Sequence, residues 1–166
     1  VEQMNAVIQQ FLDYARLDEN EVVIQLNIKS LVREVAERFE QQAESLTLEL
    51  HDVPMLRVRP LLLKRALSNL LDNAIKHGGG KITLQLKQEK NQVILAITDR
   101  GTGIPAAQRE AVKRPFAQLE TSRGNITGTG LGLAIVERAA RLHGGEFRLE
   151  DSVAGGLMAQ LIFPCA

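Results

Sequence analysis

The chain has 166 residues, of which 45% are hydrophobic, so it is long enough to bury one sizeable core. Lys plus Arg and Asp plus Glu both number 20, and this balance excludes an overall charge suited to nucleic acid or to an anionic membrane. No apolar run is long enough to cross a bilayer, and no signal-peptide pattern opens the sequence. The single cysteine, Cys165, excludes an internal disulfide and favours a reducing compartment.

The first segment, residues 1–17, has the pattern of a helix that packs lengthwise against another helix. Its apolar residues repeat at spacings of three and four: Val1, Met4, Ile8, Phe11 and Ala15. We expect the end of a bundle helix, and a helix that caps the main domain is the alternative. Because a helical pattern is already under way at Val1, a fragment of a larger protein is indicated. Residues 18–21 are expected to form an acidic linker, and 22–166 the main domain.

The main domain begins with strand and helix signals in alternation. We predict a short strand at 22–26, a helix at 28–45 capped by Asn27, a second strand at 46–50 and a brief edge strand at 56–58.

The helix that begins at Pro60 is the element around which the domain is organised. Pro60 suits a first helical turn, and the glycines at 78–80 end the helix. One side of it carries apolar residues: Leu63, Leu67, Leu70, Leu71 and Ala74. A second side carries Asn69, Asn73 and Lys76 at spacings of four and three. For this helix alone, a solvated polar face is the simpler interpretation, but two amides and an amine in register also suggest a binding site.

The second half of the domain continues with strands and helices. The predicted elements are strands at 82–86 and 93–98 joined by a turn at Asn91-Gln92, a short helix at 105–113, a helix at 131–143, and strands at 146–150 and 157–163 joined by a turn at 154–156. Residues 116–130 have little apolar periodicity, and such a stretch inside a compact domain indicates a functional lid or disorder. Leaving aside the brief edge strand at 56–58, the sequence predicts roughly five or six strands and three substantial helices.

Two glycine-rich motifs carry candidate chemistry. Asp99-Arg100-Gly101-Thr102-Gly103 follows an apolar strand, where glycines let backbone approach a flat ligand and a carboxylate accepts from an amino group. The stretch from Gly128 to Leu133 opens a helix, where free N–H groups and the helix dipole attract anions. The first motif alone is weak, because tight turns after strands often look like it. P-loop, GxGxxG and protein-kinase motifs do not occur.

In their order and spacing, these motifs resemble the ATP-binding domain of sensor histidine kinases, and more broadly the Bergerat-type ATPase superfamily. Osmolarity-sensor-type kinases are the nearest likeness. The matching stretches are Asn69 to Lys76 for the N box, Asp99 to Gly103 for the first glycine box, Arg114-Pro115-Phe116 for part of the phenylalanine box, Gly128 to Leu133 for the second glycine box and Gly155-Gly156-Leu157 for the last glycine turn. The resemblance covers about residues 20–164. It implies an α/β fold, a two-layer α/β sandwich with a mixed sheet of about five strands and three main helices, preceded by one bundle helix.

The resemblance implies an adenine end for the site. Asp99 is expected to accept a hydrogen bond from the adenine amino group. Gly101, Gly103 and Ile104 are expected beside the base, with Gly103 giving it room. His77, where the family often has Tyr, either stacks near the adenine or only ends its helix.

It also implies a phosphate end. Asn73 is expected to bind Mg²⁺, a hard ion that takes few protein ligands and keeps waters and phosphate oxygens. Asn69 is expected to assist at the metal or its waters, and Lys76 to contact phosphate. The residues expected to hold the phosphates are Gly128, Thr129, Gly130, Leu131, Gly132 and Leu133. Phe116 to Gly128 is expected to be the mobile ATP lid, in which Arg123 touches the γ-phosphate or the phosphoacceptor domain.

Three residues depart from the patterns of related families. Lys113 stands where the phenylalanine box usually has an aromatic residue, and Gln118 where a basic residue is common. Superfamily members that hydrolyse ATP, such as gyrase-type topoisomerases and heat-shock chaperones, carry a glutamate general base where this chain has Asn69. An amide cannot take up a proton at neutral pH, so a kinase is favoured. A gyrase- or chaperone-like ATPase module and a non-catalytic ATP-binding scaffold remain as alternatives.

The acceptor of the phosphoryl group is not expected in this chain. None of His51, His77 and His143 lies in a sequence like the family's phosphoacceptor box. The resemblance implies that the acceptor lies on a dimerisation hairpin, of the same or the partner chain, whose second helix ends within residues 1–17. It further implies a cognate response regulator, a homodimeric full-length protein and a cytoplasmic domain of an inner-membrane sensor. No contact of this fragment with nucleic acid or membrane is expected.

Overall fold

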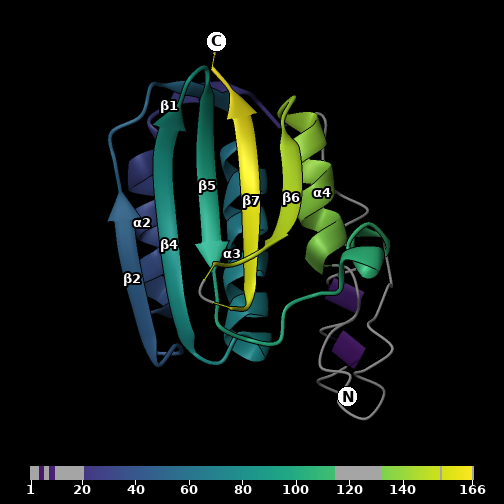
Figure 1. Cartoon of the computed structure of the whole chain (residues 1–166). Coiled ribbons are helices and arrows are strands. Elements are labelled where there is room, and N and C mark those ends of the chain that lie inside the picture. Colours follow the sequence, from purple (N-terminus) through teal and green to yellow (C-terminus); the bar gives the residue numbers. More distant parts are fainter. Residues whose placement is uncertain (1–3, 6–7, 10–20, 115–131, 154, 166) are drawn as a thin grey trace.

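The computed structural model describes residues 4–5, 8–9, 21–114, 132–153 and 155–165 (Figure 1). Its elements, in chain order, are β1 (Ile24–Leu26), α2 (Ile28–Phe39), β2 (Ser45–Leu50), β3 (Leu56–Val58), α3 (Pro60–His77), β4 (Lys81–Glu89), β5 (Gln92–Thr98), the 3₁₀ turns η1 (Ala106–Gln108) and η2 (Ala111–Lys113), α4 (Gly132–Leu142), β6 (Glu146–Asp151) and β7 (Leu157–Pro164).

The five longer strands form one mixed sheet in the order β2-β4-β5-β7-β6, in which only the β2–β4 pair is parallel. β1 and β3 form a separate antiparallel pair. Figure 1 shows α2 and α3 behind the sheet and α4 beside β6, so helices cover one face. The predicted two-layer α/β sandwich with a mixed five-stranded sheet is confirmed.

The core lies between the sheet and the helices. On β4 every second residue is buried, as the alternation of the sequence predicts. β5 is buried on both faces, because Val93, Leu95 and Ile97 join the main core while Ile94 and Ala96 pack on the outer face of the sheet. This burial on both faces explains why β5 is more apolar than β4 and shows no alternation.

The N-terminus of α3 is capped by a residue far away in the sequence. Its N-cap residue, Arg59, makes no side-chain capping bond, and Pro60 has no N–H group. The next two N–H groups, of Leu61 and Leu62, donate to the two carboxylate oxygens of Glu21 at 2.7 and 3.1 Å. Because the first N–H groups of a helix lack partners within it, Glu21 supplies the missing acceptors and a favourable negative charge.

Two predicted boundaries are wrong, and one segment for which a short helix at most was predicted has another form. α2 ends at Phe39 and not at residue 45, because the N–H groups of Gln42 and Ala43 both return to the Phe39 carbonyl. The turn between β4 and β5 lies at residues 90–91, since Gln92 pairs with Glu89. The short helix predicted at 105–113 is two separate 3₁₀ turns.

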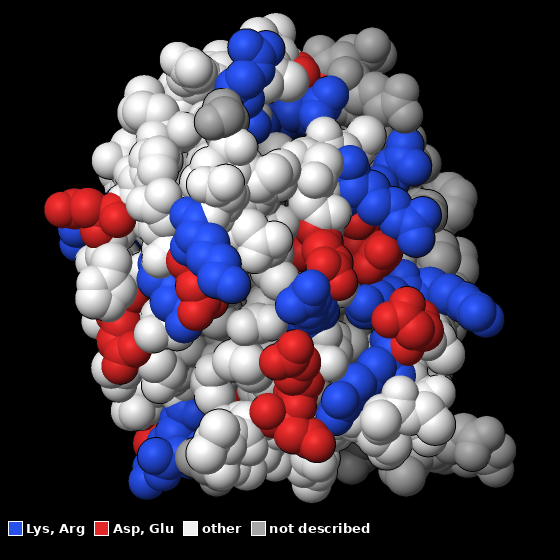
Figure 2. Space-filling model, turned by 45° about the horizontal axis from the view of Figure 1, so that its top comes forward, with Lys and Arg blue, Asp and Glu red and all other residues white. Residues whose placement is uncertain are grey.

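Residues 4–5 and 8–9 are helical, and Met4 and Ile8 are 68% and 50% exposed. The other three residues of the predicted apolar seam lie outside the described part of the chain, so the bundle helix stays a prediction. Among the described helices, none combines the length and apolarity needed to span a bilayer. On the face shown in Figure 2, positive and negative side chains are interspersed, in line with the equal totals of acidic and basic residues.

Candidate functional site

The face of α3 that carries the two amides lies apart from its apolar side. All five residues predicted on the apolar side are buried: Leu63, Leu67, Leu70, Leu71 and Ala74. Asn69 and Asn73 are half-buried, and Lys76 and His77 are exposed. The Lys76 ammonium forms an ion pair with Asp72 at 3.0 Å, with both side chains more than 40% exposed. An exposed ion pair of this kind is weak, so Lys76 is able to exchange Asp72 for another anion.

α3 and α4 run antiparallel, with the start of α4 beside the middle of α3 and the end of α4 beside the start of α3. A Cβ atom added at Gly132, the first residue of α4, would lie 3.8 Å from Oδ1 of Asn69. At the opposite end, the Arg59 guanidinium donates to the Leu142 carbonyl at 2.7 Å. Asn69 of the N box and Gly132 of the second glycine box, which are 63 positions apart in the sequence, are therefore neighbours.

Asp99 is the buried carboxylate of the site. It is 6% exposed, and its Oδ1 accepts from the N–H groups of Gly101 at 3.0 Å and Leu157 at 3.1 Å. Its other oxygen, Oδ2, accepts no hydrogen bond from the described residues. Oδ2 is also not one of the fully buried side-chain atoms without a partner. One carboxylate oxygen is thus fixed by two backbone N–H groups, while the other makes no hydrogen bond to the described residues.

Three glycines let backbone segments pack directly around Asp99. A Cβ at Gly78 would lie 2.4 Å from the Asp99 Cβ, and one at Gly156 would lie 2.2 Å from the Asp99 carbonyl oxygen. A Cβ at Gly101 would lie 2.1 Å from the His77 carbonyl oxygen. These distances are far below van der Waals contact. The end of α3, the exit from β5 and the turn before β7 are therefore held together here, and Gly101 is required by the protein's own packing.

The remaining predicted site residues are distributed as follows. Gly103 has φ +75°, which favours glycine, and Ile104 next to it is buried. Leu133 packs against the core from α4. The other predicted contacts lie outside the described residues: Phe116, Arg123, Gly128, Thr129, Gly130 and Leu131.

A polar cluster that the sequence did not predict lies at the far end of the α3–α4 pair. His143 Nε2 accepts from the N–H of Arg59 at 3.0 Å, and its Nδ1 lies 2.7 Å from the Ala139 carbonyl. Nδ1 therefore carries the proton, and the ring is neutral. Burial lowers the pKa of His143, against the opposing effect of the Ala139 carbonyl. The ring also meets Phe163 edge to face, with 5.7 Å between centroids.

The donor set at the site is not that of a transition-metal centre. Within the described residues, no group of three or more His, Cys, Asp or Glu side chains could hold a metal ion. The residues of α3 predicted to bind the metal or its waters, Asn69 and Asn73, offer amide oxygens. Such oxygens suit a hard cation that keeps waters and phosphate oxygens as its other ligands.

Comparison with known proteins identifies the family. Residues 58–166 match the family described as "Histidine kinase-, DNA gyrase B-, and HSP90-like ATPase", and the chain belongs to it. The sensor protein CreC of Escherichia coli K12 is 34% identical over 165 residues, covering 95% of this chain and 35% of CreC. The alginate biosynthesis sensor protein KinB of Pseudomonas aeruginosa is 33% identical over 145 residues, covering 83% of this chain and 24% of KinB.

A solved structure supports the same assignment. The histidine kinase domain of the E. coli osmosensor EnvZ superimposes with a TM-score of 0.65 at 31% identity, covering 88% of this chain and 89% of that domain. The predicted resemblance to the ATP-binding domain of sensor histidine kinases, the osmosensor type included, is confirmed. The chain spans only 24% and 35% of the length of the curated relatives KinB and CreC.

Proposed function

We propose that this chain is the ATP-binding catalytic domain of a two-component sensor histidine kinase. It transfers the γ-phosphoryl group of Mg-ATP to a histidine on a hairpin domain outside the chain. The observation that carries the proposal is Asp99, a buried carboxylate with Oδ1 fixed by two backbone N–H groups and Oδ2 left for an adenine amino group. Membership of the ATPase family supports ATP as the nucleotide.

The adenine end of the proposed site is built on Asp99. Oδ2 accepts from the adenine amino group, which distinguishes adenine from bases that carry a carbonyl oxygen at that position. Gly103 and the buried Ile104 lie four and five residues further along and leave space for the base. His77, exposed at the end of α3, stacks beside it.

The phosphate end is built on α3 and on the start of α4. Asn73 supplies an oxygen to Mg²⁺, and Asn69 binds the metal or its waters. Mg²⁺ bound there would neutralise charge on the phosphates. Lys76 exchanges Asp72 for a phosphate oxygen, and N–H groups from Gly128 to Leu133 donate hydrogen bonds to the phosphate oxygens.

Transfer to a histidine fits this chain better than hydrolysis. The acceptor imidazole nitrogen attacks the γ-phosphorus, the bond to the bridging oxygen breaks, and ADP leaves. The free imidazole nitrogen is already nucleophilic, so the step needs no general base from this chain. Asn69 stands where hydrolysing relatives have glutamate, and its amide cannot activate water.

The partners follow from the same proposal. They are the phosphoacceptor hairpin of the same or the partner chain and a cognate response regulator, within a homodimeric protein. Residues 1–17 would be the end of that hairpin, 18–21 the linker, and the domain would lie on the cytoplasmic side of an inner-membrane sensor.

Radioactive phosphoryl transfer tests the proposal. The chain is incubated with Mg²⁺ and γ-labelled ATP, alone and with the separate acceptor hairpin of its full-length protein. We expect acid-labile label on the hairpin and none on the chain alone, and loss of labelling with Asn73→Ala. Steady release of phosphate without the hairpin would instead indicate a gyrase- or chaperone-like ATPase. Absence of nucleotide binding in calorimetry would indicate a scaffold.

A further inference from the structure

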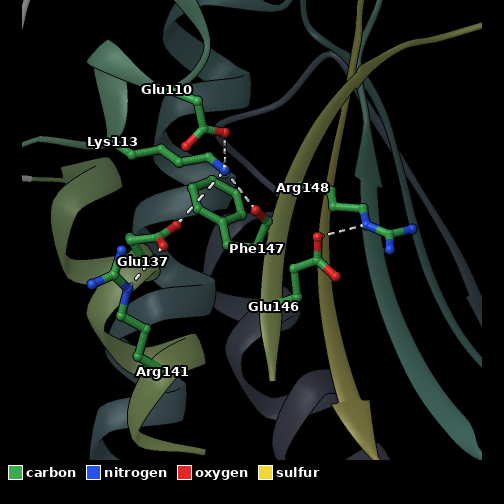
Figure 3. Close-up of polar contacts among 7 residues, drawn as sticks. All are labelled: Glu110, Lys113, Glu137, Arg141, Glu146, Phe147 and Arg148. Carbon is green, nitrogen blue, oxygen red and sulfur yellow. Dashed lines mark hydrogen bonds and ion pairs between the residues drawn. The ribbon is translucent and has the colours of Figure 1, made fainter. Parts of the chain in front are cut away.

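Lys113, at the end of η2, is a buried lysine whose ammonium joins three elements. Its side chain is 10% exposed. Nζ donates to the Phe147 carbonyl of β6 at 2.7 Å and to Glu110 Oε1 at 3.1 Å, and it lies 3.8 Å from Glu137 Oε2 of α4. Nζ also lies 5.1 Å from the centroid of the Phe147 ring, within the range of a cation–π contact. Figure 3 shows the ammonium between the two carboxylates and the carbonyl.

Glu137 is the member of this cluster that belongs to α4. Its Oε1 accepts from Arg141 Nε at 3.1 Å, but the Arg141 side chain is 77% exposed. Its Oε2 is enclosed and accepts no hydrogen bond within the described part of the chain. The ammonium of Lys113 is the charge that compensates this oxygen. Without it, Oε2 would be enclosed with neither a hydrogen bond nor a nearby ammonium, and only the exposed Arg141 would remain as a cation for this carboxylate. Leaving a carboxylate oxygen in this way is unfavourable, so Glu137 and its helix would shift.

The position of α4 matters because its first residue adjoins the amide face of α3. Glu137 lies five residues after Gly132, or about 7.5 Å along the helix axis at a rise of about 1.5 Å per residue. Gly132 in turn lies against Asn69. A helix of eleven residues moves as a unit, so a shift at Glu137 also shifts the start of α4 relative to Asn69.

We propose that Lys113 is a positioning residue for the phosphate end of the nucleotide site, a role that rests on the proposed function. Its ammonium holds α4 to η2 and β6 through Glu137 and thereby sets the start of α4 against Asn69. Lys113 stands where the phenylalanine box usually has an aromatic residue. The adenine end depends on Asp99 and on glycines of other elements, so it is unaffected by Lys113.

The test compares binding of a whole nucleotide with binding of its adenine end. Calorimetry with Mg²⁺ and a non-hydrolysable ATP analogue, and with adenosine, is performed on wild type and Lys113→Met. The control is Lys29→Met, which removes the ion pair that Lys29 of α2 makes with the exposed Asp52. We expect the analogue to bind about tenfold more weakly to Lys113→Met and adenosine to change less than about twofold. Equal losses for both ligands, or a lower melting temperature with both affinities unchanged, would overturn the proposal.

A double-mutant cycle with Glu137→Gln tests the route through α4. This variant removes a charge at nearly constant shape and carries the test on its own if Lys113→Met does not fold, with the same selective loss for the analogue expected. The double variant should bind the analogue no more weakly than Lys113→Met alone, because both changes break one interaction. Additive losses would refute the route.

Two outcomes separate the proposed function from this inference. If wild type fails to bind the analogue, the proposed function and this inference are both refuted. If wild type and Lys113→Met bind the analogue equally well, this inference alone is refuted.

Discussion

Asp99 and Leu157 are joined by two hydrogen bonds although they are 58 positions apart in the chain. The Asp99 N–H donates to the Leu157 carbonyl at 2.9 Å, and the Leu157 N–H donates to Asp99 Oδ1 at 3.1 Å. The carboxylate proposed to bind adenine is therefore fixed by the first residue of β7. The turn before β7, with Gly155 and Gly156, has to be formed correctly for Asp99 to be oriented.

Gly156→Ala is expected to destabilise the domain far more than Gly155→Ala. Both glycines have positive φ, at +95° and +89°, so alanine at either costs about 1–2 kcal/mol of backbone strain. At Gly156 the new Cβ would also lie 2.2 Å from the Asp99 carbonyl oxygen, whereas nothing lies within 4 Å at Gly155. Overpacking adds about 1–3 kcal/mol. Urea unfolding measures both variants, and equal losses would contradict the close packing described here.

Asp99→Asn is expected to weaken adenine recognition while keeping the fold. The asparagine Oδ1 can still accept from Gly101 and Leu157, so the melting temperature should stay near that of wild type. The amide group at the other position is a donor and would face the adenine amino group, which is also a donor. An unpaired buried donor costs about 1–3 kcal/mol, so affinity should fall about fivefold or more. Calorimetry with an ATP analogue measures this, and unchanged affinity would remove Asp99 from the adenine site.

Glu21→Ala is expected to lower the free energy of unfolding by about 1–2 kcal/mol, because the N–H groups of Leu61 and Leu62 lose their acceptors. Glu21→Gln keeps one acceptor oxygen and should lose roughly half as much. Glu37→Ala, which replaces an exposed glutamate within α2, serves as the control and should be nearly neutral. Chemical denaturation compares the three variants. If Glu21→Ala behaves like the control, Glu21 does not cap α3 in solution.

His143 is expected to make the domain less stable in mild acid. Burial lowers its pKa in the folded state below the unfolded value of 6.5. The unfolded chain then binds a proton more readily, so the stabilisation is complete above about pH 6.5 and is lost as the pH falls toward the lowered folded pKa. The free energy of unfolding of wild type and His143→Gln, measured between about pH 7.5 and 5.5, should show a steeper fall for wild type. His51→Gln, at an exposed position, should keep the wild-type slope. Parallel curves for all three would rule out His143 as the source.

Most elements of the fold could be predicted because their signals are local. Pro60 and the glycines after residue 77 mark the ends of α3, and the burial of its apolar side follows from helical spacing alone. The end of α2 could not be predicted, because it depends on the distant Gly80, whose carbonyl accepts from the Ser45 N–H and starts β2 there. The residues up to 45 are individually compatible with helix, so their spacing gave no stop signal.

The candidate site could be predicted only in part, for the same reason. Asn69, Asn73 and Lys76 share one helix, so their spacing alone indicates a common face. The capping of α3 by Glu21 and the ion cluster around Lys113 depend on segments that meet only in the folded chain. The glycines after Asp99 were predicted to let backbone approach a flat ligand. At Gly101, however, the group that lies close is the His77 carbonyl of the protein itself.

The one cysteine of the chain gives experimental access to the domain without further engineering. Cys165 is partly exposed and lines a shallow surface hollow with Arg57 and His143. Its N–H donates to Asn91 at the end of β5 opposite Asp99, and the seven residues of β5 between them span roughly 20 Å or more. A fluorophore or spin label attached to this thiol would stand clear of the proposed nucleotide site. Distances from it to a labelled nucleotide could therefore be measured on an otherwise unaltered chain.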